Sequence, residues 1–213
     1  PYFNQMCNEG IFFERCFSPS FGTARGIFAT ITGIPDVQLS IFSTQNQESV
    51  NQRTIINDFN GYEKFYFIGG RSQFNNFKGL VSNINNLHVY EEGSYKAQKL
   101  NVWGISDKNL FLEANDVLSK QDKPFFAIIQ TADNHRPFDI PEEDKDFARD
   151  LITNEDLQKY GFESLKEYHA FAYTDYCIKK FMETAKKTPH FNNTIFVFTG
   201  DHGVEGNATA IYP

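Results

Sequence analysis

Apolar residues gather along the chain in four short runs that are rich in Phe, Ile and Val. None of these runs alternates cleanly between apolar and polar positions, and such continuous runs are typical of strands in a sheet that is covered on both faces. The pattern therefore predicts buried strands at residues 10–13, 64–68, 124–129 and 194–198.

Two segments between these runs show short-range helical signals. Residues 23–31 form a short apolar segment that ends before a Gly-Ile-Pro stop. Residues 106–118 begin with Ser106 or Asp107 as the N-cap. Their apolar positions fall at helical spacing, at Leu110, Phe111, Ala114 and Leu118.

The clearest predicted helix covers residues 164–187. It begins at Ser164 and stops before Pro189, and two lysines near its end suit the C-terminal dipole. We expect one apolar stripe of this helix to face the core, formed by Leu165, Tyr168, Phe171, Asp175, Ile178 and Met182.

Strands that alternate with helices predict an α/β fold with a mostly parallel sheet flanked by helices. Sites in such folds form at the carboxyl ends of the strands. His135 follows the run at 124–129 and His202 follows the run at 194–198, so both are expected at one edge. The polar, turn-rich residues 36–62 and 136–162 are expected to be insertions or lids over that edge.

Composition narrows the class of protein. The 213 residues carry 20 basic and 27 acidic side chains, a net charge of −7, and 16% are aromatic. Such aromatic content excludes a disordered chain, and three cysteines are too few for a disulfide scaffold. No apolar run approaches the roughly 18 residues of a membrane-spanning helix. An isoelectric point near 5.2 argues against nucleic-acid binding. One large domain fits this length.

The strongest chemical signal is the sequence Gly200-Asp201-His202-Gly203, which directly follows a predicted strand. An Asp oxygen and a His nitrogen on one tight turn can both reach a single divalent cation such as Zn or Mn. The alternative is an ordinary turn in which Asp201 caps the backbone and His202 faces solvent, and spacing alone does not separate the two.

A second signal is a hydroxyl at the start of the first helix. Thr23 lies where backbone N–H groups and the helix dipole stabilise an anion, so a nucleophilic role is open to it. The plainer interpretation is that Thr23 is only the N-cap. Arg25 can hold a phosphate or sulfate oxygen, although an ordinary surface arginine is the default.

The third signal is His135 in the segment Asn134-His-Arg-Pro-Phe138. An imidazole just past a strand end can donate a proton to a transferring group or to a leaving oxygen. An ordinary loop histidine is the alternative.

Several segments of the chain carry sequence motifs that occur together, in the same order, in one protein family. Residues 103–107 read W-G-x-x-D and residues 134–138 read N-H-x-P-F. The matching segments are residues 1–13, 22–35, 67–76, 103–107, 134–138, 173–176 and 193–203. Together they resemble the sulfatase-like branch of the alkaline phosphatase superfamily, and within it the extracytoplasmic domains of lipoteichoic acid synthases and phosphoglycerol transferases. The resemblance implies an alkaline phosphatase-like α/β fold.

The resemblance also implies roles for individual residues. Thr23 stands where the family has the nucleophile that attacks a phosphodiester and touches the metal. Asp201 and His202 match the metal-ligand pair. His135 matches a histidine that contacts the transferred group or the leaving group.

Other positions match the segment of the family that contacts substrate. Phe74 falls there together with Asn75 or Asn76, and Arg25 is a further candidate for substrate binding. Arg71 departs from the pattern, because an acidic residue is common at its position.

The ends of the chain depart from the family as well. The first metal ligand of the family would lie upstream of Pro1, and further core strands would follow Pro213. We therefore expect residues 1–213 to be a partial sulfatase-like catalytic domain, truncated at both ends.

The nucleophile position separates subclasses. True sulfatases convert a Cys or Ser to formylglycine, whereas the equivalent position here is Thr23, and Cys16 lies seven residues too early. The resemblance thus implies a phosphotransferase that acts through a Thr nucleophile on a phosphodiester lipid donor. The alternatives are a sulfatase-like or phosphodiester hydrolase, and a non-catalytic fragment or ligand-binding domain.

The resemblance implies a cofactor, partners and a location for the intact protein. The cofactor is one divalent metal ion, Mn in the first place, with Mg, Zn or Ca as alternatives. A phospholipid or phospho-alcohol is the donor and a glycan or glycolipid is the acceptor. The domain is expected on the extracytoplasmic side of a bacterial cell membrane, attached through an N-terminal segment that precedes this chain.

Overall fold

The computed structural model describes residues 1–37 and 40–203, and its centre is a parallel sheet. The strands are β1 (Glu63–Ile68), β2 (Leu87–Tyr90) and β3 (Phe125–Gln130), in the order β2-β1-β3. Tyr66 of β1 pairs with Val89 on one side and with Ile128 on the other. The predicted strands at 64–68 and 124–129 and the predicted α/β class are confirmed.

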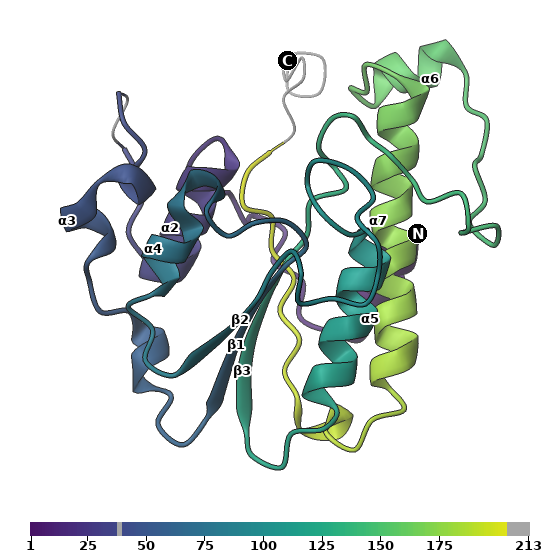
Figure 1. Ribbon diagram of the computed structural model, residues 1–213. Helices are drawn as coiled ribbons and strands as arrows, with labels where there is room; N and C mark the ends of the chain where they lie inside the picture. Colours follow the sequence, from purple (N-terminus) through teal and green to yellow (C-terminus); the bar gives the residue numbers. More distant parts are fainter. Residues whose placement is uncertain (38–39, 204–213) are drawn as a thin grey trace.

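Helices cover both faces of this sheet (Figure 1). On one face lie α2 (Thr23–Thr32), α3 (Gln47–Val50) and α4 (Phe77–Val81), and on the other lies α5 (Asp107–Leu118) with α7 (Leu165–Ala185) outside it. The remaining helical elements are α1 (Tyr2–Glu9), α6 (Asn154–Lys159), η1 (Ser43–Gln45), η2 (Ile55–Asp58), η3 (Phe74–Asn76) and η4 (Phe191–Asn193).

Alternation along β1 divides the core into two layers. Tyr66 and Ile68 are buried with the residues of α2 and α4, whereas Phe65 and Phe67 are buried against α5. A strand whose side chains are buried on both faces reads as one continuous apolar run, as the sequence pattern indicates. All four apolar positions predicted for residues 106–118 are buried, and Ser106 is the N-cap, accepting a bond from Asn109 N.

Residues 10–13 were expected to form a strand, and this prediction is wrong. The helix α1 ends at Glu9, and the following residues have no strand assignment. Ile11 is 87% exposed, and Phe12 and Phe13 are exposed as well. A short apolar run becomes a strand only where a neighbouring strand satisfies its backbone groups, and no described strand takes that place.

Residues 194–198 are likewise not assigned as a strand. Phe196 and Phe198 pack against the cluster that includes Phe181, whereas Ile195 and Val197 are 90% and 80% exposed. The side chains thus alternate as in a strand, but no ladder to a described strand accompanies them.

The stripe predicted for α7 is displaced around the helix. The buried positions are Glu167, Ala170, Tyr173, Cys177, Phe181, Met182 and Ala185, so only Met182 of the predicted stripe is buried. Asp175 instead accepts bonds from Tyr2 N and Phe3 N, both 2.7 Å, and thereby holds the start of α1. Aromatic residues occur on more than one side of this helix, so spacing alone does not fix the buried stripe, and tertiary packing selects it.

The strand β2 and the helix α4 are among the elements that were not predicted. The strand β2 is short and lies among asparagines, and the helix α4 follows two residues in the left-handed region, Asn75 (φ 50°) and Asn76 (φ 55°).

In the part of the chain that the structure describes, none of the helices combines the length and the apolar character that crossing a membrane requires.

Candidate functional site

The N-terminus of α2 presents Thr23 at the carboxyl side of the sheet. Gly22, with φ 78°, occupies the N-cap position, so Thr23 is the first helical residue and not the cap. The cap interpretation of Thr23 is therefore wrong, and its hydroxyl is available for other partners.

The partners of that hydroxyl are two imidazoles. Thr23 Oγ1 lies 3.2 Å from His135 Nε2 and 3.2 Å from His202 Nε2. The two rings are nearly perpendicular, with centroids 6.4 Å apart. Residues 112 and 179 positions apart from Thr23 thus converge on one oxygen, and the two histidines meet at one edge as the sequence predicted.

The segment with Asp201 and His202 lies directly against α2. His202 Nδ1 is 2.7 Å from Gly203 O, and because a carbonyl only accepts, Nδ1 is the donor, so that in the neutral ring Nε2 presents its lone pair toward Thr23. Asp201 Oδ2 lies 3.7 Å from the same Nε2. A Cβ on Gly26 would lie 2.2 Å from Asp201 O, so only glycine allows this approach.

The donors at this point fit a divalent cation in kind. A hydroxyl oxygen, a carboxylate oxygen and an unprotonated imidazole nitrogen are ligands that Mn, Mg or Zn accept. No group of three or more His, Cys, Asp or Glu side chains in residues 1–37 and 40–203 is arranged to hold a metal ion. The metal-ligand role of Thr23, Asp201 and His202 stays a prediction.

His135 is carried by a turn that follows β3. His135 N donates to Ala132 O at 3.0 Å, and Phe138 N donates to His135 O at 2.8 Å. Thr174 Oγ1 of α7 donates to Asn134 Oδ1 at 2.8 Å. His135 Nδ1 is buried and has no hydrogen-bond partner among the described residues. The ring is thus oriented by its turn, with Nε2 toward Thr23.

Two buried carboxyl groups hold this turn, and neither was predicted as a site residue. Asp107 accepts from Ala132 N at 2.8 Å and from Asp133 N at 3.2 Å, and Asp133 Oδ2 accepts from Asp107 N at 2.7 Å. Burial raises the pKa of both carboxyl groups, and the nearby charge of Asp107 raises the pKa of Asp133 further. Asp107 accepts two N–H groups and is the better holder of the charge, so Asp133 keeps the proton.

An aromatic row leads from His135 to Phe74. The rings of Trp103 and His135 are 4.7 Å apart, and those of Trp103 and Phe74 are 5.3 Å apart. Trp103 Nε1 donates to Arg136 O at 2.6 Å. The sequence analysis gave Trp103 no role, and its place in the W-G-x-x-D motif was the available signal.

The remaining predicted site residues have these places. Asn76 Nδ2 donates to Thr44 O at 2.6 Å, which directs this side chain to η1. Asn75 stands beside it in the left-handed region. Arg25 is buried on α2, with its guanidinium 4.8 Å from the Phe21 ring centre and 4.6 Å from that of Phe42. The substrate roles of these three residues stay predictions.

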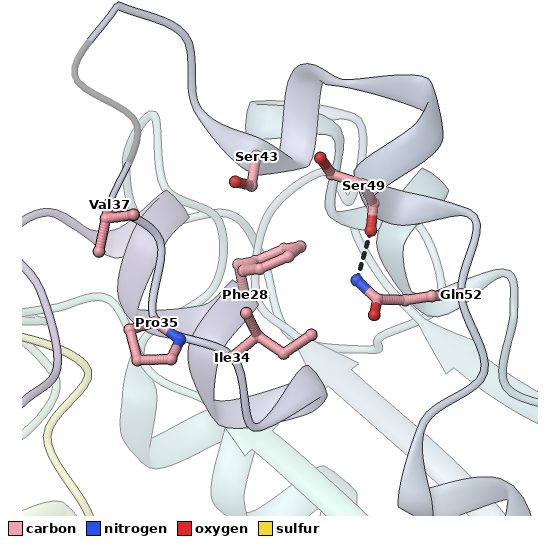
Figure 2. A pocket seen from close by; sticks show the side chains of 7 residues that line it. All are labelled: Phe28, Ile34, Pro35, Val37, Ser43, Ser49 and Gln52. Atoms are coloured by element: carbon pink, nitrogen blue, oxygen red, sulfur yellow. Dashed lines mark hydrogen bonds between the residues drawn. The ribbon is translucent and has the colours of Figure 1, made fainter.

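A separate depression lies beyond the C-terminal end of α2. Figure 2 shows its walls, with Phe28, Ile34 and Pro35 on one side and Ser43, Ser49 and Gln52 on the other. Its volume is about 270 Å³, and neither Thr23 nor either site histidine lines it. We therefore place the candidate site at the Thr23 hydroxyl and not in this depression.

The chain matches one known protein family over almost its full length. The model of the family described as Sulfatase matches residues 1–212 of the chain. The chain belongs to the Sulfatase family. The resemblance inferred from the motifs is thereby confirmed.

Relatives in this family include lipoteichoic acid synthases. Lipoteichoic acid synthase 1 of Bacillus subtilis is 23% identical over 220 residues, covering 97% of this chain and 33% of that protein. Lipoteichoic acid synthase of Staphylococcus saprophyticus is also 23% identical, covering 97% of this chain and 32% of the relative. The chain thus spans about a third of the length of these curated relatives.

Two solved structures share the fold. A protein in the alkaline phosphatase superfamily from Vibrio parahaemolyticus superposes with a TM-score of 0.72 at 27% identity, covering 89% of this chain and 45% of that one. The lipoteichoic acid synthase LtaP from Listeria monocytogenes superposes with a TM-score of 0.73 at 18% identity, over 87% and 46%. The alkaline phosphatase-like fold is confirmed over this partial length.

Proposed function

We propose that the chain is catalytic, as part of a metal-dependent phosphotransferase of the phosphoglycerol-transferase type with Thr23 as the nucleophile. One observation carries this proposal: Thr23 Oγ1, at the N-terminus of α2, lies 3.2 Å from the Nε2 atoms of both His135 and His202. A hydroxyl within hydrogen-bond reach of an imidazole is the arrangement of an activated nucleophile.

The proposed reaction balances with groups of this chain. Thr23 Oγ forms a bond to the phosphorus of a phosphodiester, and the bond from phosphorus to the leaving alcohol breaks. The Thr23 hydroxyl has a single proton, and because His202 Nε2 is assigned to the cation, this proton passes to His135 Nε2 and from there to the leaving oxygen. A hydroxyl of the acceptor then attacks this phosphorus: the bond from phosphorus to the acceptor oxygen forms, the bond to Thr23 Oγ breaks, and the acceptor proton passes through His135 Nε2 to Thr23 Oγ.

Thr23, Asp201 and His202 would hold one divalent cation, Mn in the first place. When bound, such an ion polarises the phosphoryl oxygens and lowers the pKa of a coordinated hydroxyl. The lone pair of His202 Nε2 and the nearby carboxylate of Asp201 support this assignment.

The proposed donor is a phospholipid or phospho-alcohol, and the proposed acceptor is a glycan or glycolipid on the outer side of a bacterial cell membrane. The kinship with proteins named lipoteichoic acid synthases supports these substrates. The aromatic row that ends at Phe74 gives the donor an apolar wall beside the nucleophile, and Arg25, Asn75 and Asn76 are proposed as further contacts.

The test compares Thr23→Ala with Thr30→Ala in the full-length protein. Thr30 lies on the same helix and is exposed. Its hydroxyl donates to Gly26 O of that helix at 2.8 Å. We expect Thr23→Ala to lower kcat on a chromogenic phosphodiester by at least about 1,000-fold without changing the unfolding midpoint. Thr30→Ala should retain wild-type kcat.

Four outcomes would redirect the proposal. Retained turnover in Thr23→Ala excludes the nucleophile. Cleavage of a sulfate ester alone favours the sulfatase alternative. Release of product into water at the same rate with and without added alcohol acceptors favours a hydrolase, and absence of any turnover in the full-length protein favours a non-catalytic binding domain.

A further inference from the structure

The segment from Trp103 to Asp107 touches both ends of the turn that carries His135. Asp107 receives the N–H groups of Ala132 and Asp133 at the start of the turn, at 2.8 and 3.2 Å. Trp103 Nε1 reaches Arg136 O, directly after His135, at 2.6 Å. Trp103 and Asp107 are four positions apart, as are Ala132 and Arg136 at the two ends of the turn that carries His135.

The start of the turn is fixed by a reciprocal pair of contacts. Both carboxylate oxygens of Asp107 are used by turn amides, while Asp107 N donates to Asp133 Oδ2 at 2.7 Å. Asp107 and Asp133 are 1% and 3% exposed. Burying two carboxyl groups side by side costs stability, and apolar residues of similar size would avoid that cost. What the pair supplies is a fixed backbone path ahead of His135.

The end of the turn is fixed by the indole. The Trp103 ring contacts the His135 ring at 4.7 Å between centroids, tilted by 45°. Gly104, with φ 118°, lets this segment pass against β1, because a Cβ there would lie 2.0 Å from Gly69 O. The backbone on which Trp103 and Asp107 stand is therefore itself held against the sheet.

We propose that Asp107 and Trp103 are positioning residues that hold His135 Nε2 in reach of Thr23. This inference rests on the proposed function for its effect on turnover. The expected change in structure does not depend on that function. When the Asp107 carboxylate is removed, the turn is released, and the His135 ring moves away from both Trp103 and Thr23.

The geometric test uses the indole as a probe. The full-length protein is labelled with 5-fluorotryptophan, and the 19F resonance of Trp103 is identified by its loss in Trp103→Phe. His135→Ala gives the chemical shift of Trp103 without its ring neighbour. We expect Asp107→Asn to move the resonance toward that value, and the Asp107→Asn/His135→Ala double variant to add no further change.

Asp133→Asn is the matched control. An amide oxygen can still accept the bond from Asp107 N, and a neutral side chain replaces one that keeps its proton, so the Trp103 resonance should stay at the wild-type position. A wild-type resonance in Asp107→Asn, or a double variant whose shift is the sum of the two single shifts, would overturn the proposal.

The kinetic test separates positioning from stability. Displacing a reacting group by about 1 Å costs on the order of 100-fold in rate, so Asp107→Asn should lower kcat by about that factor and leave KM within about twofold. Trp103→Phe, which keeps a ring but loses the N–H donor, should lower kcat less and carries the test if Asp107→Asn does not fold. The kcat of the Asp107→Asn/His135→Ala variant should equal that of His135→Ala.

The two tests fail differently. If Thr23→Ala retains turnover while Asp107→Asn moves the Trp103 resonance, the proposed function is wrong and the positioning role stands. If Thr23→Ala abolishes turnover while Asp107→Asn and Trp103→Phe keep the kcat and KM of the wild type, the positioning role is wrong.

Discussion

The two segments that bring a histidine to Thr23 are built in different ways. The turn with His135 is tied by side chains from the 103–107 segment and from α7, through bonds between 2.6 and 3.2 Å. The segment with Asp201 and His202 instead approaches α2 by backbone contact at Gly26. The first is positioned by buried polar groups, and the second by the absence of a side chain opposite it.

The two halves of the site are therefore vulnerable to different substitutions. A buried hydrogen-bond network fails when one partner is removed, because the other is left unsatisfied. A close backbone contact fails when a single methyl group is added. Substitutions at Gly26, Asp133 and Thr174 test these expectations, from the largest effect to the smallest.

Gly26→Ala should have the largest effect on function. Its Cβ would lie 2.2 Å from Asp201 O and 2.6 Å from Asp201 C, so Asp201 and His202 must move away from Thr23. We expect kcat on a phosphodiester to fall on the order of 100-fold and the Mn bound per protein, measured by elemental analysis after dialysis, to fall in parallel. Gly10→Ala is the control, since its Cβ would meet only Met6 O at 3.4 Å. Equal activity and metal content in the two variants would refute the backbone-contact account.

Asp133 should make stability depend on pH. Burial and the charge of Asp107 raise its folded pKa, whereas in the unfolded chain it titrates near pH 4. The contribution of Asp133 to the free energy of unfolding is fully present below about pH 4. It is lost as pH rises toward the folded pKa, by at most about 1.4 kcal/mol per pH unit.

Urea unfolding of the wild type and Asp133→Asn between pH 5 and 8 measures this contribution. The variant should be favoured relative to the wild type increasingly as pH rises, because its amide has no proton to lose. A constant difference between the two proteins across this range would show that Asp133 does not hold a proton in the folded chain.

Thr174→Val should have the smallest effect. It removes the bond to Asn134 Oδ1 across the turn and costs about 1 kcal/mol of unfolding free energy, with a few-fold loss in kcat. Thr184→Val is the control on the same helix, because both hydroxyls bond the carbonyl four residues earlier, at 3.2 and 2.8 Å. If both variants lose equal stability and activity, the bond across the turn contributes nothing.

The sequence predicted elements whose signals are local. Ser106 caps α5, the predicted apolar positions of α5 are buried, and β1 is a continuous apolar run. Residues 10–13 and 194–198 carry the same kind of apolar run, but whether such a run pairs depends on neighbouring strands that its own letters do not specify. For α7, several aromatic faces compete, and packing against α5 selects the one with Tyr173 and Cys177.

The candidate site was predictable where its residues belong to local sequence motifs, and not where it depends on tertiary contacts. Motifs marked Thr23, His135 and His202, and the structure brings them together. The pairing of Asp107 with Asp133 joins residues 26 positions apart through backbone N–H groups, which no periodicity reveals. The sequence marked Trp103 only as the first residue of the W-G-x-x-D motif, because its contact with His135 depends on how two loops pack together.

The central claim is that Thr23 becomes covalently phosphorylated during turnover. The most direct measurement is acid quenching of the full-length protein with a phosphodiester donor, followed by mass spectrometry of the peptide that contains Thr23. We predict an adduct on Thr23 that carries the donor's phosphoryl group together with its remaining alcohol, is absent from Thr23→Ala and is discharged by added acceptor alcohol. Steady turnover with no adduct on Thr23, or with the adduct on another residue, would contradict the account.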